Sequence, residues 1–161
     1  MNKTLSALIA ATMVLFSAHF SQAAFPLKPD PSLTPGELCS TPDAYRYQEN
    51  IPYCNRDVDT RTKNEIIEQY DHDLGFDIQR RPRGDFKIDH YFPLCMGGSN
   101  SVRNLWPQHK TVYEQTDALE FEVCDKMAKG RLLQRDAVEL IMKAKNDLRT
   151  VPEVRRHVQA L

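Results

Sequence analysis

The residues best suited to chemistry lie between positions 87 and 109. Asp89 can offer carboxylate oxygens to a hard divalent cation, and His90, with an ordinary pKa of about 6.5, can be neutral and accept a proton from water. A glycine turn at 97–100 and Asn104 follow. Neighbouring side chains on a regular strand point to opposite faces, so Asp89 and His90 reach one site only if the backbone bends there. We therefore expect a strand that bends at this pair.

The order of these residues resembles that of the HNH endonucleases of the His-Me finger (ββα-metal) class. The close match covers residues 86–110 and a looser one reaches Lys145. The matching residues are Asp89-His90, Pro93-Leu94, Gly97-Gly98-Ser99-Asn100 and Asn104-Leu105-Trp106-Pro107, with Tyr45-Arg46-Tyr47 and Tyr53-Cys54 more loosely. The resemblance implies that Asp89 binds a metal ion, that His90 activates water and that Asn104 braces the loop between the strands.

The chain departs from the family at the third motif position, where many members place a second metal ligand. Tyr113 stands nine residues past Asn104 and is a poor ligand for a hard cation. The nearby candidates are His109 and Glu114, of which we favour His109, and a surface histidine at a helix start is the alternative. The implied cofactor is one divalent ion, Mg²⁺ first, with Mn²⁺, Ca²⁺ or Zn²⁺ as alternatives.

Charge restricts the function classes. The chain has 21 Lys+Arg and 22 Asp+Glu, a net charge of −1, which excludes a wholly basic nucleic-acid coat protein. A local basic cluster of Arg80, Arg81, Arg83 and Lys87 precedes the Asp-His pair, and we expect it to bind phosphates without reading sequence. A second basic group between 126 and 156 is equally well explained as a solvated helix face.

The pattern of apolar residues predicts an α+β fold: a small ββα-metal hairpin plus helix, packed with additional helices and a disulfide-tied N-terminal segment. We expect a helix over 62–71 with a capping box at Thr62 and Glu65, a strand from 86 to 94, and a return strand over 102–106. A long helix after Pro107 ends at Gly130, and a second runs to about residue 148.

Residues 1–23 have the layout of a secretory signal peptide cut after Ala23, and a membrane anchor is the alternative. Export would favour disulfides, and four cysteines allow three pairings. We prefer Cys39 with Cys54 and Cys95 with Cys124 over four buried thiols. The domains expected are a Pro-rich, disulfide-tied lead-in (24–57), a nuclease-like domain (58–150) and a C-terminal tail (151–161).

The resulting hypothesis is a periplasmic or extracellular metal-dependent endonuclease that cleaves DNA, with RNA as the alternative substrate, at low sequence specificity and without a stable membrane anchor. The rival hypothesis is a secreted binding or structural module that keeps the finger fold but has lost the reaction. A third hypothesis, a toxin, predicts an inhibitor protein as partner and ranks last.

Overall fold

A short antiparallel hairpin forms the centre of the computed structural model, which describes residues 25–161. The hairpin consists of β3 (Phe86–His90) and β4 (Leu105–His109), and α2 (Lys110–Ala128) follows it directly. The other elements are β1 (Ala44–Arg46), β2 (Ile51–Tyr53), α1 (Thr60–Leu74), α3 (Gln134–Asn146) and α4 (Val151–Ala160). The predicted α+β class is confirmed, and the β1–β2 pair is an element that the sequence did not predict.

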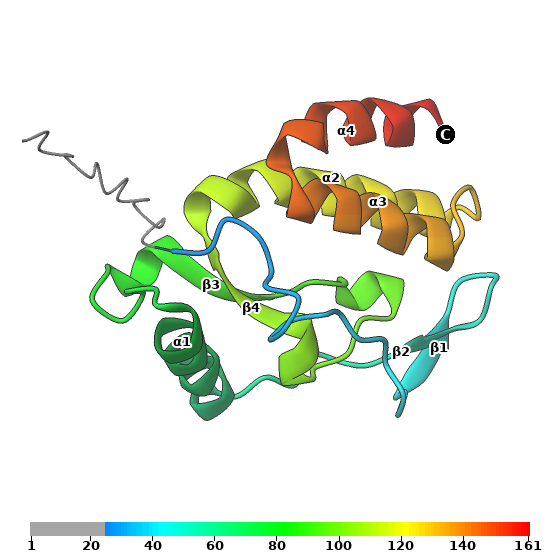
Figure 1. Ribbon diagram of the computed structural model, residues 1–161. Coiled ribbons are helices and arrows are strands. Elements are labelled where there is room, and N and C mark those ends of the chain that lie inside the picture. Colours follow the sequence, from blue (N-terminus) through cyan, green and yellow to red (C-terminus); the bar gives the residue numbers. More distant parts are fainter. Residues whose placement is uncertain (1–24) are drawn as a thin grey trace, which may run out of the picture.

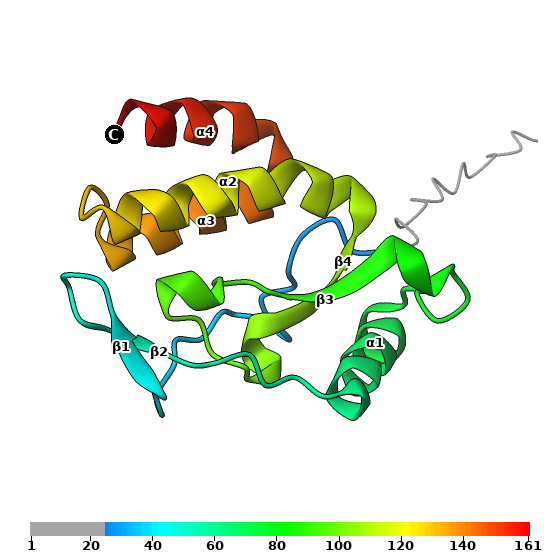
Figure 2. The same cartoon turned by 180° about the vertical axis from the view of Figure 1, so that it is seen from behind.

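The β3–β4 hairpin lies between two helical layers, with α1 on one side and α2, α3 and α4 on the other (Figure 1). The view from behind shows the same order and places the β1–β2 hairpin beyond the end of β3 (Figure 2). Ile66, Ile67 and Tyr70 of α1 are buried with the hairpin in one apolar core, and α2, α3 and α4 share a second core. The hairpin is therefore held from both faces.

Helix α1 extends beyond the predicted 62–71. Asp59, not Thr62, caps it, because the Asp59 carboxylate accepts a hydrogen bond of 2.7 Å from Thr62 N. Gly75 ends the helix with a φ of 71°, in the left-handed region that favours glycine. The helix itself is confirmed, and the capping box at its start is wrong.

The C-terminal residues form a packed helix, so the predicted tail over 151–161 is wrong. Helix α4 buries Val151, Val154 and Val158, and it packs against α2 and α3. Valines at this spacing lie on one face of a helix, and burying that face stabilises the short segment. The predicted boundary at residue 150 therefore does not divide the fold.

Both predicted disulfides are present: Cys39–Cys54 closes the N-terminal segment, and Cys95–Cys124 ties the β3–β4 loop to α2. None of the helices over residues 25–161 has the length and apolar character needed to cross a membrane. The predicted signal peptide lies outside the described residues.

The strand β3 is regular to its end, so the predicted bend at Asp89-His90 is wrong. Asp89 pairs with Trp106 and His90 with Leu105. The ladder continues beyond His90, because Tyr91 N donates a hydrogen bond of 2.7 Å to Asn104 O. Residues 102–104 form a 3₁₀ turn, which moves the return strand from the predicted 102–106 to 105–109. Asp89 and His90 therefore present their side chains to opposite faces of the hairpin.

Candidate active site

Asn104 organises the loop that joins β3 to β4. Its side chain is fully buried, and its Oδ1 accepts a hydrogen bond of 2.9 Å from Phe92 N. Its Nδ2 donates to Phe92 O at 3.0 Å and to Ser99 O at 2.9 Å. One amide group thus ties Asn104 to the loop backbone 12 and 5 residues earlier in the chain, at Phe92 and Ser99, which agrees with the bracing role that the family resemblance implies for Asn104.

The glycine pair at 97–98 lets this loop close. Gly97 has a φ of 80°, and a Cβ atom at Gly98 would lie 1.7 Å from Phe92 O. A side chain at Gly98 cannot be accommodated without moving the backbone that Asn104 holds. The glycines therefore serve the close approach of the two ends of the loop.

The ring of His90 lies on one face of the end of the hairpin. Only 3% of the residue is exposed, and its Nε2 lies 3.1 Å from Asn100 Oδ1. Burial lowers the pKa of His90 below its ordinary value, and the nearby Arg56 guanidinium acts in the same direction. The imidazole is therefore neutral at pH 7, as a proton acceptor must be.

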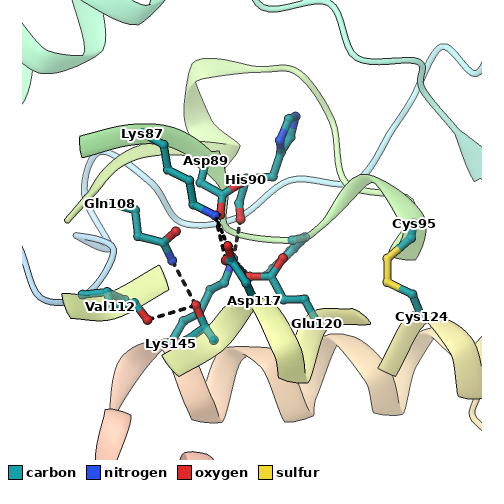
Figure 3. A network of polar contacts seen from close by, with 12 residues as sticks. Lys87, Asp89, His90, Cys95, Gln108, Val112, Asp117, Glu120, Cys124 and Lys145 are labelled. Atoms are coloured by element: carbon teal, nitrogen blue, oxygen red, sulfur yellow. Dashed lines mark hydrogen bonds and ion pairs between the residues drawn. A yellow bond between two sulfur atoms is a disulfide. The ribbon is translucent and has the colours of Figure 1, made fainter. Parts of the chain in front are cut away.

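The carboxylate of Asp89 lies on the other face, between β3 and α2, together with two acids that were not among the predicted site residues. One oxygen each of Asp89, Asp117 and Glu120 lies within 4.8 Å of the others. Figure 3 shows these carboxylates gathered between the strand and the helices, with the His90 ring pointing away from them. We call Asp89, Asp117 and Glu120 the carboxylate cluster.

Two lysine ammonium groups lie within the carboxylate cluster (Figure 3). Lys87 Nζ lies 2.7 Å from Asp117 Oδ1 and 3.2 Å from Asp89 Oδ2. Lys145 on α3 is fully buried, with its Nζ 2.8 Å from Glu120 Oε1, and it donates a hydrogen bond of 2.6 Å to the backbone oxygen of His90. Lys87 remains about one third exposed and can leave the cluster more easily than Lys145.

Burial and these lysines shift the pKa values of Glu120 and Asp89 in opposite directions. Burial raises the pKa of Glu120 to about 7, although Lys145 partly offsets the effect. Burial alone would also raise the pKa of Asp89, but the ammonium groups of Lys145 and Lys87 hold it below its usual value. At neutral pH Asp89 is therefore ionised, and Glu120 is divided between its two forms.

His109, the favoured second metal ligand, lies at the other end of the hairpin. It pairs with Phe86, about 13 Å along the strand from His90 at 3.3 Å per residue. Its Nδ1 accepts a hydrogen bond from Thr111 N at the start of α2, and its ring stacks on Phe25 with centroids 3.8 Å apart. The structure does not bring His109 to Asp89, because four strand positions separate the two ends of β4 and the ring serves as a helix cap.

Glu114, the alternative ligand, lies on α2 one turn before Asp117 and is not a member of the carboxylate cluster. Among residues 25–161, the acids that join Asp89 in a group able to hold a metal ion are Asp117 and Glu120. A signal for them was present in the sequence, since residues three apart on the predicted helix share one face. What the sequence did not reveal was how that helix would be rotated toward Asp89.

Most of the predicted phosphate-binding residues also lie away from His90. Arg83 donates to Phe86 O at 2.8 Å, Arg81 lies over the Phe25 ring, and Arg80 pairs with Asp77. These contacts place the basic loop at the start of β3, whereas His90 is at its end. Of the four predicted residues, the structure brings only Lys87 to the carboxylate cluster.

A different cation accompanies His90. Arg56, an exposed residue of the segment that follows the Cys39–Cys54 disulfide, donates a hydrogen bond of 3.3 Å to Ile88 O. Its guanidinium is close enough to act on the pKa of His90. Arg56 was not among the predicted site residues, because the segment that carries it is separated from His90 by more than thirty positions along the chain.

Comparisons of this chain with models of protein families, with curated proteins and with solved structures found no match.

Proposed function

We propose that the chain is an exported, metal-dependent endonuclease that hydrolyses phosphodiester bonds of DNA, with RNA as the alternative substrate. The observation that carries the proposal is the meeting of three carboxylates from β3 and α2 at the end of the hairpin where a neutral histidine also lies. The order of the motif, with Asp89, His90 and Asn104 at their family positions, agrees with it. The two disulfides fit an oxidising compartment.

The residues of the carboxylate cluster fit a hard divalent cation in their chemistry. All three offer carboxylate oxygens, which are the ligands that Mg²⁺, Mn²⁺ and Ca²⁺ prefer. Asp89 Oδ2 and Glu120 Oε1 are buried and accept no hydrogen bond within residues 25–161, facing lysine ammoniums across ion pairs instead. A bound ion would supply positive charge for the scissile phosphate, and Lys87 would have to move outward to admit it.

His90 would serve as the general base that takes a proton from the attacking water. Its neutral ring and its fixed contact with Asn100 suit that role. Because Asp89 and His90 occupy opposite faces, the substrate phosphate would have to lie across the end of the hairpin to meet both. Arg56 stands beside His90 at this end, and its exposed guanidinium suits a phosphate oxygen.

The second candidate function is a secreted binding or structural module without catalytic activity. The observation that favours it is the presence of Lys87 and Lys145 in the carboxylate cluster, since two ammonium groups already neutralise the acids that an ion would need. The near-complete burial of His90 points the same way. In this case the cluster is a structural ion-pair network that joins β3, α2 and α3.

A plasmid-nicking assay with the oxidised protein and a panel of Mg²⁺, Mn²⁺, Ca²⁺ and Zn²⁺ tests the proposal. We expect nicking with at least one ion, its loss in the presence of a chelator, and its loss in His90→Ala and Asp89→Asn. Asp125→Asn is the matched control, because this acid lies on α2 outside the cluster and pairs with Lys129. The control should nick as well as the parent protein.

The melting temperature measured under the same conditions separates the two candidate functions. An ion that raises the melting temperature and enables nicking supports the nuclease. Failure to nick with every ion, or His90→Ala that nicks as well as the parent protein, would reject the nuclease and leave the non-catalytic module.

A further inference from the structure

The side chain of Asn100 connects His90 to the N-terminal segment. Asn100 Nδ2 donates a hydrogen bond of 2.6 Å to the backbone oxygen of Asn55, and Asn100 Oδ1 lies 3.1 Å from His90 Nε2. A backbone oxygen can only accept, so the NH₂ group of Asn100 must face Asn55. Turning the amide over would bring two oxygens together, and the orientation of Asn100 is therefore fixed by its partner.

This orientation determines which nitrogen of His90 carries the proton. Asn100 Oδ1 has no hydrogen to donate, so the contact is a hydrogen bond only if His90 Nε2 donates. In the neutral ring one nitrogen donates and the other accepts. Nδ1 is therefore the nitrogen with a free lone pair.

We propose that Asn100, oriented by the backbone oxygen of Asn55, is a positioning residue that holds His90 in the Nε2–H tautomer and leaves Nδ1 to take the proton from water. The part of the proposal that concerns water rests on the proposed nuclease function. The tautomer rests only on the contacts of Asn100.

The N-terminal segment that supplies Asn55 is itself tied to the β3–β4 loop. The disulfide Cys39–Cys54 ends one residue before Asn55, and Cys39 N donates a hydrogen bond of 2.7 Å to Gly97 O. The contacts of the segment with the loop thus include one through Cys39 at Gly97 and one through Asn55 at Asn100. Because the disulfide joins these two points, the acceptor for Asn100 is held at a fixed place beside the histidine.

Nitrogen-15 NMR of the histidine side chains at a pH above the titration of His90 tests the tautomer directly, without any activity. In the parent protein we expect the proton on Nε2, slow exchange of that proton with water, and a lone pair on Nδ1. In Asn100→Ala we expect averaged tautomer shifts and faster exchange. Asn100→Asp keeps an acceptor for Nε2, so it should retain the Nε2–H tautomer while losing the tie to Asn55.

Asn64→Ala is the matched control, because Asn64 is an exposed asparagine of α1, and it should leave the His90 signals unchanged. A proton on Nδ1 in the parent protein would overturn the proposal, and so would Asn100→Ala with unchanged shifts and exchange. The measurement on the parent protein needs no variant, so misfolding of a variant cannot obscure it.

Nicking kinetics then distinguish positioning from substrate binding. If Asn100 positions His90, Asn100→Ala should lower kcat by up to about 100-fold with KM unchanged, because a misplaced catalytic group loses rate and not affinity. A rise in KM at constant kcat would contradict positioning. If the parent protein nicks no substrate, the proposed function fails, and the NMR measurement still decides the tautomer.

Discussion

Replacing Lys145 by methionine tests whether the ion pairs behind the hairpin hold the fold together. Lys145 is fully buried on α3, and its ammonium group pairs with Glu120 at 2.8 Å and donates to His90 O at 2.6 Å. Methionine keeps the length and apolar stem of the side chain but removes both polar contacts. The substitution therefore leaves a buried carboxyl and a backbone oxygen without their partner.

The expected loss of stability is about 3–5 kcal/mol, the usual cost of removing one partner from a buried ion pair. Lys143→Met on the same helix is the matched control, since Lys143 pairs with Glu153 at 2.9 Å but is about half exposed. An exposed pair contributes about 0–1 kcal/mol, so the control should unfold nearly like the parent protein. Equilibrium unfolding in urea measures both variants.

The effect of Lys145→Met should also depend on pH. The pKa of Glu120 is about 7 in the fold and close to 4.5 in the unfolded chain, so the folded state holds a proton that the unfolded chain has released. Its contribution to stability is complete below about pH 4.5 and is lost as pH rises through 7. Without Lys145 the folded pKa rises further. The destabilisation should therefore be larger at pH 8 than at pH 5, by up to about 1.4 kcal/mol, because pH 8 lies only about one unit above the parent's pKa.

Two results would refute this reasoning. Stability of Lys145→Met equal to that of Lys143→Met would mean that the buried ion pairs contribute little over an apolar side chain at this place. Equal destabilisation at pH 5 and pH 8 would mean that Glu120 does not respond to the loss of its partner.

Four further predictions concern the loop, the disulfide and the site. Asn104→Ala should cost more than about 3 kcal/mol in urea unfolding, because it leaves several buried backbone groups unpaired at about 1–3 kcal/mol each. Replacing Cys39 and Cys54 together by alanine should cost about 3 kcal/mol in the same assay, the value expected for a loop of about 15 residues. Nicking should persist below pH 6.5 in a pH–rate profile, because burial lowers the pKa of His90 and keeps the base neutral there. Lys87→Met should bind Mn²⁺ at least about fivefold more tightly in calorimetry, because it removes a competing charge worth about 1 kcal/mol or more.

The sequence predicted the local elements of the hairpin region with useful accuracy. The glycine turn, the asparagine before an apolar pair and the long uninterrupted stretch after Pro107 indicated two strands followed by a helix, and β3, β4 and α2 have that order. The disulfide partners were also predicted correctly, because a short closed loop favoured Cys39 with Cys54. These features depend on neighbouring residues, whose conformational preferences act locally.

The strand β3 illustrates where local reasoning failed. Both candidate groups were expected on one face, but the hydrogen-bonded ladder holds β3 straight through His90. Paired backbone groups favour a regular strand unless a bulge or a break interrupts the pairing. The sequence shows that Asp89 and His90 are neighbours, but it does not show the regular strand pairing that places their side chains on opposite faces.

Charge partners were likewise decided by tertiary structure. The sequence shows that Arg80, Arg81 and Arg83 precede the Asp-His pair, yet a strand of five residues separates their loop from His90. Arg56 comes from a distant part of the chain and lies beside the histidine. Distance along an extended strand grows by about 3.3 Å per residue, so nearness in sequence does not make nearness in space.

The sequence by itself determined the types of α1, β3, β4, α2 and α3, the preferred disulfide pairs and several residues able to do chemistry, because each of these follows from residue type and short-range spacing. Only the tertiary structure decided that Asp117, Glu120, Lys87 and Lys145 gather around Asp89 while Asn100 and Arg56 accompany His90. The physical reason is that the rotation of α2 and α3 against the hairpin is set by packing of their apolar faces. That packing carries the polar residues of the same helices to partners that no local pattern specifies.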